Sequence, residues 1–322
     1  MERKVWKTAR IVLLFFLVFI MMPVLSHAQE YPTKPINFIM PTTIGTVPRA
    51  LLEDAKKFIE QPFVITVKAG GGGTVAMTAL AKEKPDGYTV AMATPLPLVV
   101  IPQLRKMSYS LEDFTPITTF SQSVAALVVR ADSPWNTLKD LVEYTRKNPR
   151  KVRCSVSSGV GNFKEVALRC IAKKEGIDWI YVPYPTDDGP GLTDLLGGHI
   201  EVLSAGPVWV PHVKAGKLRI LAAYMHHRMK SFPDVPTLEE LGYGLSLEVP
   251  LAVFGPKGTP QAIVKKLDSV FRKALDEPGF IQTVKNSNYE LVYYNPEDSK
   301  KWFDSARVLW ASLIKEYNIP AE

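Results

Sequence analysis

The sequence has few cysteines and histidines, and this scarcity argues against several kinds of site. Two cysteines and five histidines occur among 322 residues, without a C-x-x-C pair or zinc-type histidine spacing. We therefore expect no metal and no cofactor. Cys154 and Cys170 are expected to be buried thiols, and a disulfide between them stays an alternative because a secreted chain would permit one.

Signatures of nucleotide binding and of nucleophilic catalysis are also missing. The glycine run at 70–73 is not followed by the Gly-Lys-Ser/Thr of a P-loop, and Gly159 and Gly161 lack the third glycine of a dinucleotide fingerprint. No Gly-x-Ser-x-Gly elbow occurs, and no base accompanies Ser157 or Ser158. The sequence therefore predicts that the protein is not an enzyme.

Positive charge is concentrated at the N-terminus. Four basic residues precede an apolar run at 11–25, and small residues occupy the positions before a cleavage point after Ala28. We expect residues 1–28 to be a secretory signal peptide, with export to the periplasm; a membrane anchor is disfavoured because the run is short. Removing four Lys/Arg and one Glu lowers the formal charge from +7 to +4. The remaining chain has no basic, aromatic-laced patch, so nucleic acid is not an expected partner.

The chain after the signal opens with alternating strands and helices. Apolar runs at 35–40, 63–67 and 88–93 predict strands, and helical spacing at 51–59 and 74–83 predicts helices. This order is typical of an α/β fold with a parallel sheet, whose ligands bind beyond the carboxyl ends of the strands. The loops expected to converge on one crevice are 41–48, 68–74 and 94–98.

The same β-loop-α theme restarts near residue 130, which predicts a second lobe. We expect the chain to cross between the lobes twice, near 125–131 and 246–254. The predicted organisation places 29–127 and 250–322 in lobe 1 and 128–249 in lobe 2. Strands of the second lobe are expected at 152–157, 180–182, 200–203 and 218–223.

Helix starts are marked by capping residues. Thr137 with Asp140 resembles a capping box, and Thr259 before Pro260 is a predicted N-cap. Asn295 before Pro296 repeats this device. Asn162 has N-cap spacing too, and its amide is also a candidate contact for a ligand.

Charged side chains near the expected crevice each allow two interpretations. Asp187 and Asp188 are favoured as exposed loop carboxylates, with polar contacts at the crevice mouth as the alternative. Arg49 is either an exposed helix residue or a positive charge that pairs with an anionic ligand. His226 and His227, beside a basic residue, indicate a solvated basic turn.

Eight motifs occur in a fixed order and cover nearly all of the chain after the signal. They are Tyr31-Pro-Thr-Lys-Pro-Ile36, the glycine run at 70–73, Pro85-Asp-Gly-Tyr-Thr89, Asp113-Phe-Thr-Pro116, Val182-Pro-Tyr184, Leu192-Thr-Asp-Leu-Leu-Gly-Gly198, Lys214-Ala-Gly-Lys-Leu-Arg219 and Phe232-Pro-Asp-Val-Pro-Thr237. In this order they resemble the substrate-binding proteins of tripartite tricarboxylate transporters, the Bug family.

This resemblance implies a two-lobed periplasmic binding protein of the type II-like, Venus flytrap kind, each lobe a mostly parallel sheet flanked by helices. Such a protein closes around a small organic ligand, commonly a carboxylate. The implied partners are that ligand and the permease subunits of a tripartite tricarboxylate-type transporter, with the receptor a monomer. A sensory role beside a membrane sensor kinase and a periplasmic enzyme are the alternatives.

The resemblance also assigns the ligand to two facing loops, where this sequence departs from the family pattern. Thr46 replaces a usual glycine, Arg49 a usual aspartate, and Asn162 a usual threonine, while Glu165 takes the place of a histidine. We hypothesise that Arg49 binds a ligand carboxylate directly. The expected ligand-binding residues are Thr42, Thr43, Ile44, Gly45, Thr46, Arg49, Gly72, Gly73, Thr94, Ser157, Ser158, Gly159, Gly161, Asn162, Tyr184, Asp187, Ser204 and Ala205.

Overall fold

A computed structural model describes residues 31–42, 45–157, 162–184 and 187–319. The described residues from Lys34 onward form one structural unit. The predicted signal peptide at 1–28 lies outside the described residues. Within the described part of the chain, no helix combines the length and apolar character that crossing a membrane requires.

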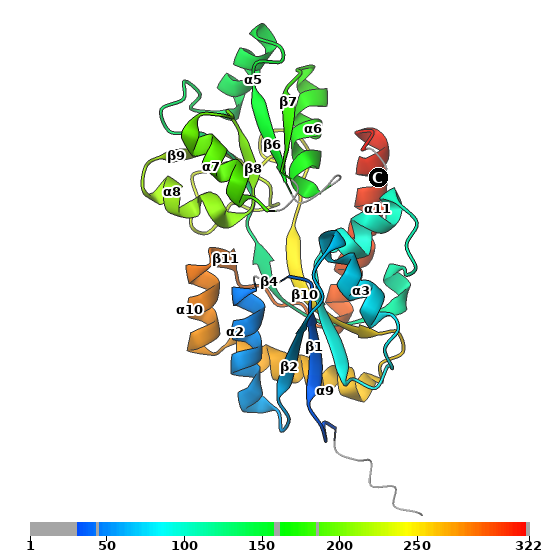
Figure 1. Ribbon diagram of the computed structural model, residues 1–322. Helices are drawn as coiled ribbons and strands as arrows, with labels where there is room; N and C mark the ends of the chain where they lie inside the picture. The colour runs from blue at the N-terminus through cyan, green and yellow to red at the C-terminus, as the bar shows by residue number, and fades with distance from the viewer. Residues whose placement is uncertain (1–30, 43–44, 158–161, 185–186, 320–322) are drawn as a thin grey trace, which may run out of the picture. The chain divides into compact units, whose positions relative to one another are not determined.

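The first sheet has six strands in the order β11-β4-β10-β3-β1-β2 (Figure 1). Its N-terminal strands are β1 (Ile36–Met40), β2 (Phe63–Val67) and β3 (Thr89–Ala93), and β1 pairs in parallel with both neighbours. The strands are joined through α2 (Thr46–Ala55) and α3 (Thr74–Leu80). The predicted β-α-β-α-β order is confirmed, and the buried apolar residues of β1 and β3 suit a parallel sheet covered on both faces.

The other half of this sheet is antiparallel. β4 (Phe114–Ser123) and β10 (Val249–Pro256) pair with each other over most of their length, and β11 (Tyr289–Glu290) pairs with β4. β4 leads the chain out of this sheet and β10 brings it back, so two such strands lying side by side must run in opposite directions. The sheet is therefore mixed, and its parallel part is confined to β1–β3.

The second lobe contains two smaller sheets. β5 (Ala126–Arg130) lies between β8 (Leu203–Ala205) and β9 (Leu218–Ala223) and is antiparallel to both. β6 (Arg153–Ser157) and β7 (Ile180–Tyr184) form a parallel pair, which a single bridge from Cys154 to Val202 joins to the strand region before β8. The chain crosses from β4 to β5 and returns before β10, so the two predicted crossovers are confirmed. The boundaries drawn between the lobes in the sequence stay a prediction.

Helices cover both faces of the first sheet. Figure 1 shows α2 and α10 on one side of it and α3 and α11 on the other, and α9 packs against α2 and β4. The second lobe carries α5 to α8. The bounds not yet given are α4 (Ile101–Leu104), α5 (Leu138–Lys147), α6 (Phe163–Glu175), α7 (Gly189–Gly197), α8 (Val210–Lys214), α9 (Gln261–Leu275), α10 (Pro278–Asn286) and α11 (Pro296–Glu316).

Most predicted helix starts are confirmed, and one is wrong. Thr137 Oγ1 accepts the Asp140 N–H at 3.1 Å, and Asn295 accepts the Asp298 N–H at 2.9 Å. Thr259 is not the N-cap of α9. Its hydroxyl donates to the Pro256 carbonyl at 2.7 Å instead, so the helix begins one residue later.

The C-terminal end of α11 reaches the second lobe. α11 packs along β4, and beyond its last turn the Tyr317 hydroxyl contacts Cys170 Sγ of α6 at 3.1 Å. Lys173 of α6 also lies over the Tyr317 ring. Cys154 and Cys170 are both free and buried, and burial raises the pKa of each thiol. The interpretation as buried thiols is confirmed.

Candidate functional site

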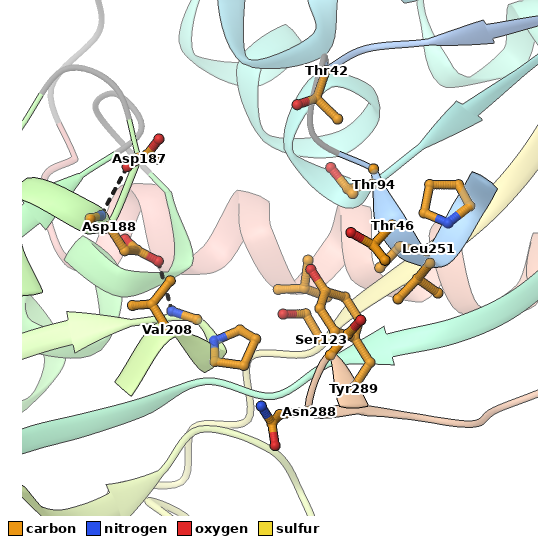
Figure 2. A pocket seen from close by; sticks show the side chains of 18 of the residues that line it. Thr42, Thr46, Thr94, Ser123, Asp187, Asp188, Val208, Leu251, Asn288 and Tyr289 are labelled. Atoms are coloured by element: carbon orange, nitrogen blue, oxygen red, sulfur yellow. Dashed lines mark hydrogen bonds between the residues drawn. The ribbon is translucent and has the colours of Figure 1, made fainter. Parts of the chain in front are cut away.

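A cavity of about 740 Å³ lies where the carboxyl ends of β1 and β3 face the second lobe. Its size falls within the roughly 300–1,000 Å³ typical of small-molecule sites. Figure 2 shows Thr46, Thr94 and Leu251 on one side and Asp187, Asp188 and Val208 on the other. The cavity therefore lies at the carboxyl ends of the parallel strands, where an α/β sheet is expected to bind its ligand.

The first-lobe wall combines hydroxyl groups with a helix start. Thr42 follows β1 and Thr94 follows β3, while Gly45 and Thr46 begin α2, and all four line the cavity. No acidic residue lies in the first turn of α2. The first N–H groups of a helix lack intrahelical acceptors and carry a partial positive charge, so this wall favours an anionic group.

The second-lobe wall is built on a buried ion pair. Lys164 Nζ lies 2.6 Å from Asp188 Oδ1, and their side chains are only 5% and 11% exposed. Ser157 joins them, because its hydroxyl donates to Asp188 and accepts from Lys164 Nζ at 2.9 Å. The Gly206 N–H donates to the other Asp188 oxygen at 2.9 Å. Asp188 is therefore not an exposed loop carboxylate, and that favoured interpretation is wrong.

The backbone of Lys164 is fixed from two sides. Asn162 caps α6 as predicted, and its side-chain oxygen accepts the Lys164 N–H at 2.8 Å and the Glu165 N–H at 3.3 Å. Ser204 donates to the Lys164 carbonyl at 3.0 Å and shares a hydrogen bond with Tyr224 at 2.6 Å. Burial raises the pKa of Tyr224 well above its ordinary range. The phenol is thus neutral at physiological pH and completes a rigid support for the lysine.

The strands β4 and β10, which connect the lobes, and the neighbouring β11 form the floor of the cavity. Ser123 ends β4, Leu251 lies in β10, and Asn288 and Tyr289 lie at β11; all line the cavity (Figure 2). Burial raises the pKa of Tyr289, with a hydrogen bond to Ser123 acting in the opposite direction. The floor therefore offers an un-ionised phenol and small polar groups beside an apolar wall.

The predicted ligand-binding residues divide into three groups. Thr42, Gly45, Thr46, Thr94 and Asp187 line the cavity, whereas Asn162 lines a smaller adjoining cavity of about 100 Å³. Thr43, Ile44, Ser158, Gly159 and Gly161 lie outside the described residues. Those described but absent from the lining of both cavities are Arg49, Gly72, Gly73, Ser157, Tyr184, Ser204 and Ala205.

Several of these residues support the site from behind. Arg49 does not: it is exposed on α2, so its role as a direct cation stays a prediction.

Two residues of the second lobe are held by internal hydrogen bonds. The Tyr184 hydroxyl donates to Asp194 at 2.5 Å, and the Ala205 carbonyl accepts from Trp209. Gly73 has φ of +99°, and a Cβ there would lie 3.0 Å from Pro97. The glycine run thus permits close packing at the start of α3.

Sequence reasoning missed the residues that make the cavity most distinctive. Lys164 lies in the first turn of a helix that follows an expected ligand loop. Arg49 has the same position after its own loop, and this position is why Arg49 was considered as a ligand contact. Ser123 and Tyr289 lie in β4 and β11, and neither strand was predicted. Asp188 was considered as a contact at the crevice mouth, but no pattern in the sequence predicts its burial, because that burial depends on the facing Lys164.

Comparison with known proteins agrees with this architecture. The family described as "Tripartite tricarboxylate transporter family receptor" (TctC) matches residues 47–319. A Cupriavidus necator protein, "UPF0065 protein in gbd 5'region", is 32% identical over 281 residues, covering 86% of this chain and 85% of that relative.

Solved structures give the same result. The periplasmic binding protein BugD is 27% identical with a TM-score of 0.76, covering 91% of this chain and 100% of that one. R. palustris Rpa4515 with adipate is 26% identical with a TM-score of 0.77, covering 90% of this chain and 99% of that one. With its mixed α/β lobes and the cavity between them, this chain belongs to the tripartite tricarboxylate transporter family receptors, the Bug-type solute-binding proteins.

Proposed function

We propose that this chain is a periplasmic receptor that captures a small organic carboxylate in the cavity and delivers it to a tripartite tricarboxylate-type permease. Family membership supports the receptor role, and the relative with adipate supports a carboxylate ligand. The placement of Lys164 is the observation that carries the ligand class. Among the described lining residues, Lys164 is the one that bears a positive charge.

Two helix starts reinforce this preference for an anion. The first turn of α2 lines the cavity from one lobe, and Phe163 and Lys164 in the first turn of α6 line it from the other. A carboxylate held between them gains from both helix dipoles and from a charge-assisted hydrogen bond to the ammonium. Because it contacts both lobes, it stabilises the closed arrangement.

The carboxylates of the cavity limit which anions fit. Asp188 pairs with Lys164 and offsets part of its positive field, and Asp187 adds a further negative charge, with its Oδ1 accepting the Gly189 N–H at 2.8 Å. A ligand with several carboxylates and no hydrogen-bond donors meets repulsion here. We therefore expect a carboxylate that also carries hydroxyl or amino groups, which donate to these aspartates.

A ligand screen followed by variants tests the proposal. Mono-, di- and hydroxycarboxylates, amino acids and neutral solutes are compared by thermal shift, since a ligand that binds the native state raises apparent stability. The affinity of the best ligand is then measured by calorimetry for the wild type, Lys164→Met, Lys164→Arg and Arg49→Ala. Lys174→Met, on the same helix but exposed, is the matched control.

We expect Lys164→Met to weaken binding by about tenfold to a hundredfold, as losing a charge-assisted hydrogen bond would. Lys164→Arg should keep part of the affinity, and Lys174→Met should keep all of it. A response to neutral or cationic solutes alone would contradict the carboxylate proposal. If Arg49→Ala weakens binding while Lys164→Met does not, the cation is Arg49.

A further inference from the structure

His226 and His227 belong to the second lobe and do not line the cavity described above. They follow β9, and each contacts a carboxylate: His226 Nδ1 hydrogen bonds with Glu248, and His227 Nε2 lies 2.8 Å from Glu290 Oε2. The side chains of Glu248 and Glu290 are only 10% and 8% exposed. The two histidines are therefore more than the solvated basic turn that the sequence indicates.

Three potential metal ligands converge at this point. One ring nitrogen from each histidine and one Glu248 oxygen all lie within 4.8 Å of one another. A zinc ion with bonds of about 2.0–2.1 Å holds tetrahedral ligands roughly 3.3 Å apart. The His226 side chain is 57% exposed, so a change of its rotamer, with loss of the direct hydrogen bond to Glu248, can bring the three ligand atoms to that spacing.

The surrounding hydrogen bonds have the arrangement found around metal ligands. With His227 Nε2 engaged by Glu290, its Nδ1 remains as a ligand atom, and Glu290 is itself held by the Lys230 N–H at 3.1 Å. Trp302 Nε1 donates to the second oxygen of Glu248 at 3.3 Å. Metal-binding histidines generally donate their other N–H to a carboxylate, and ligating carboxylates are hydrogen-bonded in turn.

We propose that His226, His227 and Glu248 form a binding site for a divalent transition-metal ion, with Glu290 orienting His227. Two imidazole nitrogens and one carboxylate oxygen suit Zn²⁺, Ni²⁺ or Cu²⁺, whereas Mg²⁺ and Ca²⁺ prefer oxygen ligands. The exposed side of His226 leaves the remaining coordination position to water.

The position of this site explains why the sequence does not show it. The two histidines are adjacent, and Glu248 comes from a segment more than twenty residues further along, immediately before β10. The site therefore forms only when the returning crossover lies against the end of β9. A bound ion would tie these two segments together at the point where the lobes join.

Metal titration of the chain without an affinity tag tests the site. After EDTA treatment and dialysis, Zn²⁺ binding is measured by calorimetry, and Co²⁺ is used as a spectroscopic probe of its ligands. We expect about one equivalent of Zn²⁺ and visible Co²⁺ bands of a four-coordinate N/O site. Cu²⁺ should also quench the fluorescence of the neighbouring Trp302. Mg²⁺ and Ca²⁺ should give neither heat nor protection from thermal unfolding.

Variants then assign the ligands. His226→Ala, His227→Ala and Glu248→Gln should each weaken Zn²⁺ binding at least about tenfold, and Glu290→Gln by about tenfold to a hundredfold through loss of orientation. His199→Ala and His212→Ala are the matched controls and should bind as the wild type does. His226 is exposed, so its alanine variant is expected to fold, which circular dichroism verifies.

Two results would overturn the proposal. One is a wild-type chain that shows no Zn²⁺ binding and no four-coordinate Co²⁺ spectrum. The other is a His226→Ala, His227→Ala double variant that binds Zn²⁺ as tightly as the wild type, because the metal would then be held elsewhere.

Discussion

The pairing of Lys164 with Asp188 should govern stability as well as binding, and removing one partner tests this directly. Lys164→Met leaves a nearly buried carboxylate without its counter-charge. Losing one member of a buried pair costs about 3–5 kcal/mol of unfolding free energy. Ser157 and the Gly206 N–H still donate to Asp188, so we expect a value near the lower end, about 3 kcal/mol.

Replacing both partners should cost less than the sum of the single changes. In the Lys164→Met, Asp188→Asn double variant no charge is left buried, and the amide can still hydrogen bond with Ser157 and Gly206. We expect a coupling free energy of about 2 kcal/mol between the two positions. Urea denaturation followed by circular dichroism measures all four members of the cycle.

An exposed pair supplies the control for this cycle. Lys300 and Asp304 lie 2.6 Å apart on α11 with side chains 67% and 40% exposed, so Lys300→Met should change stability by less than about 1 kcal/mol. The reasoning is refuted if Lys164→Met is as mild as Lys300→Met. Additivity of the two cavity substitutions within about 0.5 kcal/mol would refute it too.

Three further predictions concern single positions. Asn162→Ala should lower the unfolding free energy by about 1–2 kcal/mol through loss of the α6 cap, and Asn162→Asp should recover only part of this in urea titrations, because it keeps the acceptor but loses the donation from Nδ2 to the Ser157 carbonyl. Gly73→Ala should cost more than about 1 kcal/mol, since φ is +99° and the new methyl meets Pro97; a neutral result would contradict this account of the glycine run. Burial raises the pKa of Asp268 above its ordinary 3.8, with hydrogen bonds from Tyr293 and Thr118 opposing. The stability contributed by this carboxyl is therefore present below pH 3.8 and lost as pH rises through the folded pKa. Asp268→Asn should accordingly stabilise the protein at pH 7 but not at pH 3, and equal effects at both would refute the assignment.

Sequence patterns predicted the elements whose physics is local. β2 was predicted to the residue because five apolar and β-branched side chains lie between clear breakers, and Asn162 was predicted as a cap from its spacing to Glu165. β4 was missed because its second half is rich in Thr, Ser and Gln, which is more typical of a loop. In the fold these hydroxyls are satisfied by distant partners: Ser121 donates to the Glu290 carbonyl at 3.0 Å, and Thr119 meets Ser299 at 2.9 Å.

The candidate site divides along the same line. The loops that hold Thr42, Thr46 and Thr94 were predicted because they follow strand ends, where an α/β sheet binds its ligands, and the family resemblance pointed to the residues themselves. The roles of Lys164 and Asp188 were not predicted. A charged side chain is buried only beside a partner, and these two partners come from α6 and from the start of α7, which are separate in the sequence. From the sequence, Arg49 was therefore the predicted cation of the site, and in the fold this side chain is exposed.

The contact between Tyr317 and Cys170 has a consequence for how such a receptor moves. The paired strands β4 and β10 join the lobes at one place, and the end of α11 joins them again through α6. If both attachments persist when the ligand leaves, we expect the lobes to rotate about the line that joins them, because rotation about any other axis would break one of the two.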